Sequence, residues 1–170
     1  MDLKLKGRTA LVTGASKGIG LAVARVMAEE GCHVHLAART RGDLEHEAAR
    51  IRADFGVEAH VHARDLSRLA EVEALGAACG DVDILVNNAG DIPTGTLTEL
   101  DAEKWRRGWD LKVFGFIDLT RILYPRMLAR KSGVIINVIG AAAEMPSPNY
   151  IDRKSTRLNS SHLGISYAVF

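Results

Sequence analysis

Tyr150 and Lys154 form a pair whose residue types and spacing could support catalysis. A tyrosine can exchange a proton with a substrate oxygen, but its ordinary pKa of about 10 is too high for efficient work near neutral pH. A neighbouring ammonium group favours the phenolate and lowers that pKa. The pair therefore suggests acid–base chemistry, provided that both residues belong to the folded domain.

The sequence after Ile151 differs in character from everything before it. The stretch DRKSTRLNSSHLG has neither apolar periodicity nor a strand followed by a helix, and its composition is that of a disordered segment. Residues 152–170 can also be read without a gap as the translation of a DNA sequencing adapter. We therefore predict that residues 1–151 form the domain and that residues 152–170 are a non-native, disordered tail. If that tail were native instead, Tyr150 and Lys154 would be the catalytic pair.

Composition excludes several classes of function. A net charge of +1 gives no electrostatic footprint for nucleic acid or for an anionic membrane. No apolar run approaches the roughly 18 residues of a membrane span. Cys32 and Cys79 form neither a C-x-x-C motif nor a disulfide framework, which is typical of a reducing compartment. These features predict a cytoplasmic protein that acts on a small molecule.

Apolar runs and amphipathic segments alternate along the chain. Such an alternation predicts an α/β domain with a doubly wound parallel sheet, a Rossmann fold. Within the first helix, Ile19, Val23, Val26 and Met27 share one face at helical spacing. The predicted strands are 8–14, 33–39, 58–65, 82–90 and 133–140, and the predicted helices are 18–31, 42–56, 66–80 (with Ser67 as a possible cap) and 101–130.

A glycine-rich stretch, TGASKGIG, lies between the first strand and the first helix. Gly14 and Gly18 permit a tight turn that lets the backbone approach a pyrophosphate, which then rests on the positive N-terminus of the helix. Gly20 allows the helix to pack closely on the sheet. The pattern predicts a dinucleotide-binding loop.

Together with NNAG at 87–90, this loop resembles the short-chain dehydrogenase/reductase family, over about residues 5 to 151. The resemblance implies hydride transfer between a nicotinamide cofactor and an alcohol or carbonyl substrate, in a homo-oligomer (dimer or tetramer). It also implies sixth and seventh strands that this sequence lacks, so residues 1–170 alone are expected to be inactive. A nucleotide-binding member without turnover, as a sensor or structural protein, and lyase or isomerase chemistry on the same fold are alternatives. By resemblance, the cofactor-binding residues are Gly14, Ser16, Lys17, Gly18, Ile19, Gly20, Asp65, Leu66, Asn88, Ala89 and Gly90.

The end of the second strand bears on the choice of cofactor. A carboxylate there would bind the ribose 2′-hydroxyl of NAD(H) and repel a 2′-phosphate. The sequence instead has Ala38 followed by Arg39, which can bind a phosphate bidentately, and Lys17 adds a second positive charge. NADP(H) is therefore favoured over NAD(H), although both cations could instead be solvated surface residues.

The catalytic positions depart from the family's pattern of Asn, Ser, Tyr and Lys. The asparagine position falls on Lys112, with Asp110 as a second candidate, and a lysine that extends from the helix to solvent is the alternative. The serine position falls on Gly140, which has no hydroxyl. Tyr150 lies three residues before the position expected for the tyrosine, where Arg153 stands. Lys112 and Tyr150 are thus the catalytic candidates.

Two histidine pairs, His33-x-His35 and His60-x-His62, fall on strands predicted to be neighbours. Four imidazoles could hold zinc, but the sequence shows no accompanying cysteine or acidic pattern, so we predict hydrogen-bonded or partly exposed histidines and no metal site. The aromatic residues of the long helix are expected to pack against the sheet or a partner subunit. They are Trp105, Trp109, Phe114 and Phe116.

Overall fold

The computed structural model describes residues 3–91 and 98–139. Tyr150, Lys154, Arg153 and Gly140 lie outside these residues. The strands are β1 (Thr9–Thr13), β2 (His33–Ala38), β3 (Ala59–Ala63), β4 (Ile84–Asn87) and β5 (Val134–Asn137). The helices are α1 (Gly18–Glu29), α2 (Arg41–Phe55), α3 (Leu69–Ala78), α4 (Ala102–Trp109) and α5 (Gly115–Arg130), with a π-helical turn, η1, at Asp110–Phe114.

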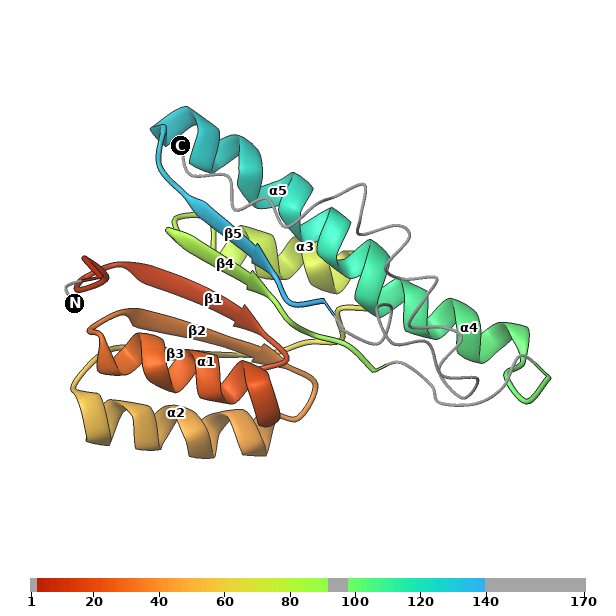
Figure 1. Cartoon of the computed structure of the whole chain (residues 1–170), viewed down its shortest axis with the longest axis horizontal. Coiled ribbons are helices and arrows are strands. Elements are labelled where there is room, and N and C mark those ends of the chain that lie inside the picture. Colours follow the sequence, from red (N-terminus) through yellow and green to blue (C-terminus); the bar gives the residue numbers. More distant parts are fainter. Residues whose placement is uncertain (1–2, 92–97, 140–170) are drawn as a thin grey trace.

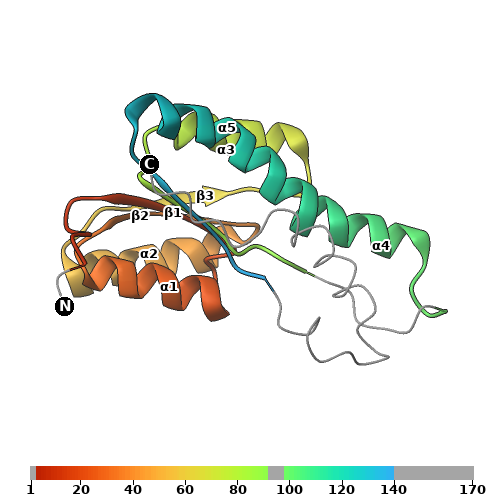
Figure 2. The same cartoon turned by 45° about the horizontal axis from the view of Figure 1, so that its top comes forward.

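The five strands form one parallel sheet in the order β3-β2-β1-β4-β5. The chain moves outward from β1 to β3, then crosses to β4 on the other side of β1, which confirms the predicted doubly wound α/β fold. Helices α1 and α2 cover one face of the sheet, and α3 and α5 cover the other (Figures 1 and 2). The change of direction leaves the carboxyl ends of β1 and β4 side by side, where ligands bind in open α/β sheets.

Helix α1 packs on the sheet through small residues. Gly20, Ala24 and Ala28 are spaced four apart and are buried, whereas Ile19 and Val26 are exposed. Of the four residues predicted to share one face, Val23 and Met27 pack against the core, whereas Ile19 and Val26 do not. The small stripe brings the helix axis close to the sheet and turns Ile19 and Val26 outward. This close approach fixes the start of α1 against the end of β1.

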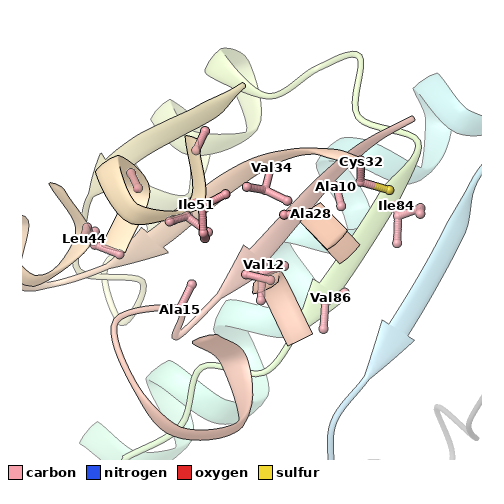
Figure 3. Packing of buried hydrophobic residues seen from close by; sticks show 14 residues of the cluster. Ala10, Val12, Ala15, Ala28, Cys32, Val34, Leu44, Ile51, Ile84 and Val86 are labelled. Carbon is pink, nitrogen blue, oxygen red and sulfur yellow. The ribbon is translucent and has the colours of Figure 1, made fainter. Parts of the chain in front are cut away.

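Figure 3 shows the core on the α1–α2 face of the sheet. Val12 and Val34 of the central strands lie close to Ala28 of α1 and Ile51 of α2. All four side chains are almost completely inaccessible to solvent. Because burial of apolar side chains is the main stabilising term of folding, this packing holds both helices in fixed positions on the sheet.

The predicted long helix at 101–130 is present, but one turn of it is π-helical. Asp101 caps the start, where its carboxylate accepts a hydrogen bond from the Lys104 N–H at 2.8 Å. The π-helical turn η1 follows α4 directly and leads into α5. Such turns are rare and occur frequently at functional sites. None of the helices in the described part of the chain is long and apolar enough to cross a membrane.

Ser67 does not cap α3, so that prediction is wrong. The helix begins at Leu69 after Arg68, and its cap position makes no side-chain hydrogen bond. The Ser67 hydroxyl instead donates to the Asp65 carboxylate at 2.7 Å. The serine thereby shapes the loop between β3 and α3.

Candidate nucleotide-binding site and catalytic residues

A cleft of about 360 Å³ lies at the carboxyl ends of the strands. It contains nine of the residues that the sequence assigns to the cofactor and six that it does not. The predicted residues that line it are Gly14, Ser16, Lys17, Ile19, Arg39, Leu66, Asn88, Ala89 and Gly90. The additional residues are Ala38, Thr40, Asp43, Arg64, Asp91 and Leu111. Gly18, Gly20 and Asp65 are not part of the lining.

The glycine-rich loop has the backbone that its sequence predicts. Gly14 and Gly18 have φ angles of +67° and +60°, a region that side chains rarely adopt. Helix α1 starts at Gly18, and its N-cap residue Lys17 provides no side-chain cap hydrogen bond. The first turn of α1 therefore keeps N–H groups for an anion, with the positive end of the helix dipole behind them.

Gly20 acts by packing rather than by lining the cleft. A Cβ atom at this position would lie 2.3 Å from the Gly14 carbonyl oxygen and 2.5 Å from Asn88 Nδ2. Only glycine fits between the start of α1, the loop and the end of β4. This geometry agrees with the close packing of helix on sheet that the sequence predicts.

Thr13 and Asn88 hold the loop in place. The buried Thr13 hydroxyl donates to the Val86 carbonyl at 3.2 Å and accepts from the N–H groups of Asn88 and Ala89 at 2.9 and 3.0 Å. Asn88 Nδ2 donates to the carbonyls of Thr13 and Gly14 at 3.0 and 3.4 Å. The ends of β1 and β4 are thus joined by hydrogen bonds, and the NNAG segment supports the floor of the cleft. Sequence reasoning gave no role to Thr13, although its place at the end of β1 is a usable signal.

Two arginines, each paired with a carboxylate, line the part of the cleft that follows β2 and β3. Arg39 directly follows β2 and pairs with the Asp91 carboxylate at 3.0 Å, with both side chains about half exposed. Arg64 directly follows β3 and pairs with Glu71 at 2.8 Å. Sequence reasoning missed Arg64, although a residue that directly follows a parallel strand is well placed to meet a ligand.

Asp65 lies beside the cleft, in the loop after β3. Its carboxylate accepts hydrogen bonds from the Ser67 N–H and hydroxyl at 3.2 and 2.7 Å. Burial raises the pKa of Asp65, but the bonds from Ser67 and the nearby Arg39 charge outweigh it and lower the pKa below its ordinary value. The carboxylate is therefore ionised at neutral pH and orders the loop that carries Leu66.

Lys112 lies in the π-helical turn η1 and points inward. Its Nζ atom donates to the Val138 carbonyl at 2.6 Å and lies 4.5 Å from the centre of the Phe116 ring. A Cβ atom on Gly90 would lie 3.0 Å from Lys112 Cδ, so the side chain lies against the cleft. Burial lowers the pKa of this ammonium group to about 8. The alternative of a lysine that extends to solvent is wrong.

The other candidates that the structure describes do not line the cleft. Asp110 is exposed on the outer side of the same turn. Tyr150 lies outside the described residues. Among the aromatic residues of the long helix, Phe116 is buried against the sheet, whereas Trp105, Trp109 and Phe114 line a small groove on the outer surface. Lys112 is thus the catalytic candidate that the described residues place beside the cleft.

The four histidines do not converge on one point. His33 Nδ1 accepts a hydrogen bond from the Glu58 N–H at 3.1 Å. His60 pairs with the Glu58 carboxylate at 3.3 Å. His35 and His62 lie together, 2.9 Å apart between His35 Nδ1 and His62 Nε2.

The cleft lies where the strand order changes direction, between β1 and β4. Together with the glycine-rich turn and the N-terminus of α1, this position defines a dinucleotide-binding α/β domain. A family model described as short chain dehydrogenase matches residues 8–152. The chain belongs to this family.

Relatives and solved structures agree with that assignment. The Bacillus subtilis protein named uncharacterized oxidoreductase YvrD is 32% identical over 160 residues, which cover 92% of this chain and 60% of that protein. The fatty acyl-CoA reductase of Acinetobacter baylyi is 39% identical over 140 residues, or 79% of this chain and 47% of that protein. The crystal structure of L-sorbose reductase from Gluconobacter frateurii, complexed with NADPH and L-sorbose, matches with a TM-score of 0.88 and 36% identity over 93% of this chain and 62% of that one. The chain therefore spans about 60% of the length of several proteins that it matches.

Proposed function

We propose that this chain is the nucleotide-binding part of an NADP(H)-dependent oxidoreductase that transfers hydride between the nicotinamide and an alcohol or carbonyl carbon. The observation that carries the proposal is the cleft itself, in which the N-terminus of α1 and the Arg39 guanidinium face the same space. The N-terminus of α1 suits a pyrophosphate, and the Arg39 guanidinium suits a 2′-phosphate. The NADPH complexes of two related proteins, from Gluconobacter frateurii and Sphingobium yanoikuyae, support it.

The residues present fit such a cofactor. Gly14 lets the loop pack tightly on the NNAG segment beside the cleft, because a Cβ atom there would lie 2.9 Å from Asn88 Nδ2 and 3.0 Å from Ala89 Cα. The loop and the first turn of α1 would hold the pyrophosphate, Leu66 and Ala89 would contact the adenosine, and Arg39 with Lys17 would hold the 2′-phosphate. When bound, the cofactor supplies the hydride.

Lys112 is proposed to hold and release a proton beside the reaction. The resemblance places an asparagine amide here, whereas this chain places an ammonium group whose pKa of about 8 lets it exchange a proton near neutral pH. Its donor bond to the Val138 carbonyl fixes Nζ at the end of β5. A proton held at this point can exchange with water in the cleft.

Two alternatives remain testable for the same site. The replacement of an amide by Lys112 motivates a nucleotide-binding member without turnover, and the same fold could carry lyase or isomerase chemistry. Oxidation of NADPH with a panel of aldehydes and ketones, measured on the protein encoded by the complete source frame, separates them. Tight binding without oxidation of NADPH by any carbonyl compound would contradict the reductase proposal.

The domain boundaries and the environment are part of the proposal. Residues 1–151 are proposed to be the nucleotide-binding domain, which the family match over residues 8–152 supports, and residues 152–170 are proposed to be a non-native tail. A cytoplasmic location is proposed because Cys32 and Cys79 are both free thiols. Association with a second copy through the long helix is proposed because Phe114 and Leu128 expose about half of their apolar surface there.

The choice of cofactor is tested by calorimetric titration of the chain with NADPH and with NADH. Loss of Arg39 in Arg39→Ala removes charge-assisted hydrogen bonds to the 2′-phosphate, each worth about 1.5–3 kcal/mol. We expect NADPH affinity to fall by about 10- to 100-fold, with NADH affinity unchanged. Arg41→Ala is the matched control, because Arg41 is an exposed arginine that pairs with Glu45 on α2 and does not line the cleft. Equal loss of both affinities, or of neither, would contradict NADP(H) selection by Arg39.

A further inference from the structure

Three metal-binding side chains converge on the α3 side of the sheet, away from the nucleotide cleft. His35 comes from β2, His62 from β3, and Cys79 directly follows the last residue of α3. His35 Nδ1 lies 2.9 Å from His62 Nε2, and Cys79 Sγ lies 3.4 and 3.5 Å from these two nitrogens. The three donor atoms thus form a closed triangle, and none of the three residues lines the cleft.

The edges of this triangle are close to those of a tetrahedral zinc site. With Zn–N distances of about 2.0–2.1 Å and a Zn–S distance of about 2.3 Å, tetrahedral angles place two nitrogens about 3.3 Å apart and a nitrogen about 3.6 Å from the sulfur. The observed nitrogen–sulfur distances are within about 0.2 Å of that value, and the nitrogens need to separate by only about 0.4 Å.

Binding of an ion replaces the present contact between the two rings. One of His35 Nδ1 and His62 Nε2 carries the proton of their hydrogen bond, whereas a metal needs the lone pair of both nitrogens. Each ring therefore has to carry its proton on the opposite nitrogen in the metal-bound state. The Cys79 thiol releases its proton to solvent when the ion binds, because the ligand form of cysteine is the thiolate.

We propose that the chain binds one zinc-type divalent ion through His35 Nδ1, His62 Nε2 and Cys79 Sγ, with water as the fourth ligand. One thiolate with two imidazoles favours borderline-soft ions over magnesium or calcium, which prefer oxygen ligands. His60 is outside this set, because its ring stacks on His35 at 4.7 Å and its Nε2 pairs with Glu58.

The bound ion would tie three elements together. β3 lies at one edge of the described sheet, and the loop from β3 to α3 carries Asp65 and Leu66. An ion that links β2, β3 and the end of α3 fixes both ends of the segment that consists of β3, this loop and α3. Its expected effect is therefore stabilisation of the fold and of the adenosine side of the cleft, not chemistry on the substrate.

Cobalt(II) is the probe for the site, because it takes zinc positions and reports thiolate ligation by a charge-transfer band in the near ultraviolet. We expect the chain to bind one equivalent of Co²⁺ with this band, and Zn²⁺ to abolish it by displacement. The band should be absent in Cys79→Ser. The affinity should fall at least about 10-fold in His62→Gln.

Two matched controls separate this site from adventitious binding. Cys32→Ser removes the other buried thiol, which donates to the Leu5 carbonyl, and His46→Gln removes an exposed histidine on α2. Both controls should bind cobalt as the unchanged chain does. Absence of the thiolate band in the unchanged chain, or its persistence in Cys79→Ser, would overturn the proposal. So would loss of the band in Cys32→Ser.

Thermal unfolding gives a second readout that does not depend on the nucleotide site. Zn²⁺ at 100 times its dissociation constant should raise the Tm of the unchanged chain by roughly 5–10 °C. In His62→Gln, whose fold is checked by circular dichroism, the same Zn²⁺ concentration should raise the Tm by at most about half as much, because the affinity is at least about 10-fold lower. An equal Tm rise in His62→Gln would also refute the site.

Discussion

The close contact at Gly20 makes a sharp prediction for the variant Gly20→Ala. The added methyl group would lie 2.3 Å from the Gly14 carbonyl oxygen, at least 1.1 Å closer than an ordinary van der Waals contact. The obstacle is backbone, so α1 must move away from the loop and Asn88 must give up its position. Overpacking of this kind costs about 1–3 kcal/mol, and the better helix propensity of alanine offsets up to about 1 kcal/mol.

We therefore expect Gly20→Ala to lower the free energy of unfolding by about 2 kcal/mol and to weaken NADPH binding more than 10-fold. Urea unfolding followed by circular dichroism measures the first effect and calorimetric titration the second. Gly42→Ala is the matched control, because Gly42 is also a helical glycine but has no atom within 4 Å of an added Cβ. That control should raise stability by up to about 1 kcal/mol. If Gly20→Ala were as stable as Gly42→Ala, the close packing of α1 on the loop would be wrong.

Three further substitutions test the hydrogen bonds and charges around the cleft. Thr13→Val leaves two backbone N–H groups after β4 without an acceptor and should cost about 2–4 kcal/mol in urea unfolding, whereas Thr13→Ser should retain most of the stability. The low pKa of Lys112, about 8 against an ordinary 10.5, means that the unfolded chain holds more protons on this side chain between those values, so stability should rise with pH there. Between pH 8 and 10 the unchanged chain should gain roughly 2 kcal/mol relative to Lys112→Met in urea unfolding, and a flat difference would contradict the burial of the charge. Asp91→Asn frees Arg39 from its surface ion pair and should raise NADPH affinity by up to about 5-fold, measured by calorimetry. Weaker NADPH binding in this variant would refute the competition between Asp91 and the 2′-phosphate.

Local sequence signals predicted the fold because each of them acts over a short distance. Apolar runs located the five strands, and the glycine-rich turn located the start of α1 to the residue. Which residues of α1 pack against the sheet could not be predicted from such local signals. Helical spacing placed Ile19, Val23, Val26 and Met27 on one face, but the helix packs on the sheet through Gly20 and Ala24. This choice depends on how close the helix lies to the sheet and not on the helix sequence alone.

Site residues that directly follow a strand could be predicted from the sequence. Residues whose position depends on contacts between segments far apart in the chain could not. Arg39 was expected at the cleft because it follows β2, and Arg64, which follows β3, could have been found by the same reasoning. The inward position of Lys112 depends on the Val138 carbonyl, which no local pattern reveals. Cys79 joins His35 and His62 only because α3 folds back over β2 and β3, so the sequence showed two histidine pairs without their third partner.

The most direct test of the central claim is a crystal structure of this chain with NADP⁺. We expect the pyrophosphate on the loop between Gly14 and Gly20, at the N-terminus of α1, and the 2′-phosphate on the Arg39 guanidinium. The Asp91 carboxylate should have separated from Arg39 to admit the phosphate. A nucleotide bound elsewhere, or one bound in the cleft with its 2′-phosphate away from Arg39 and Lys17, would contradict the account.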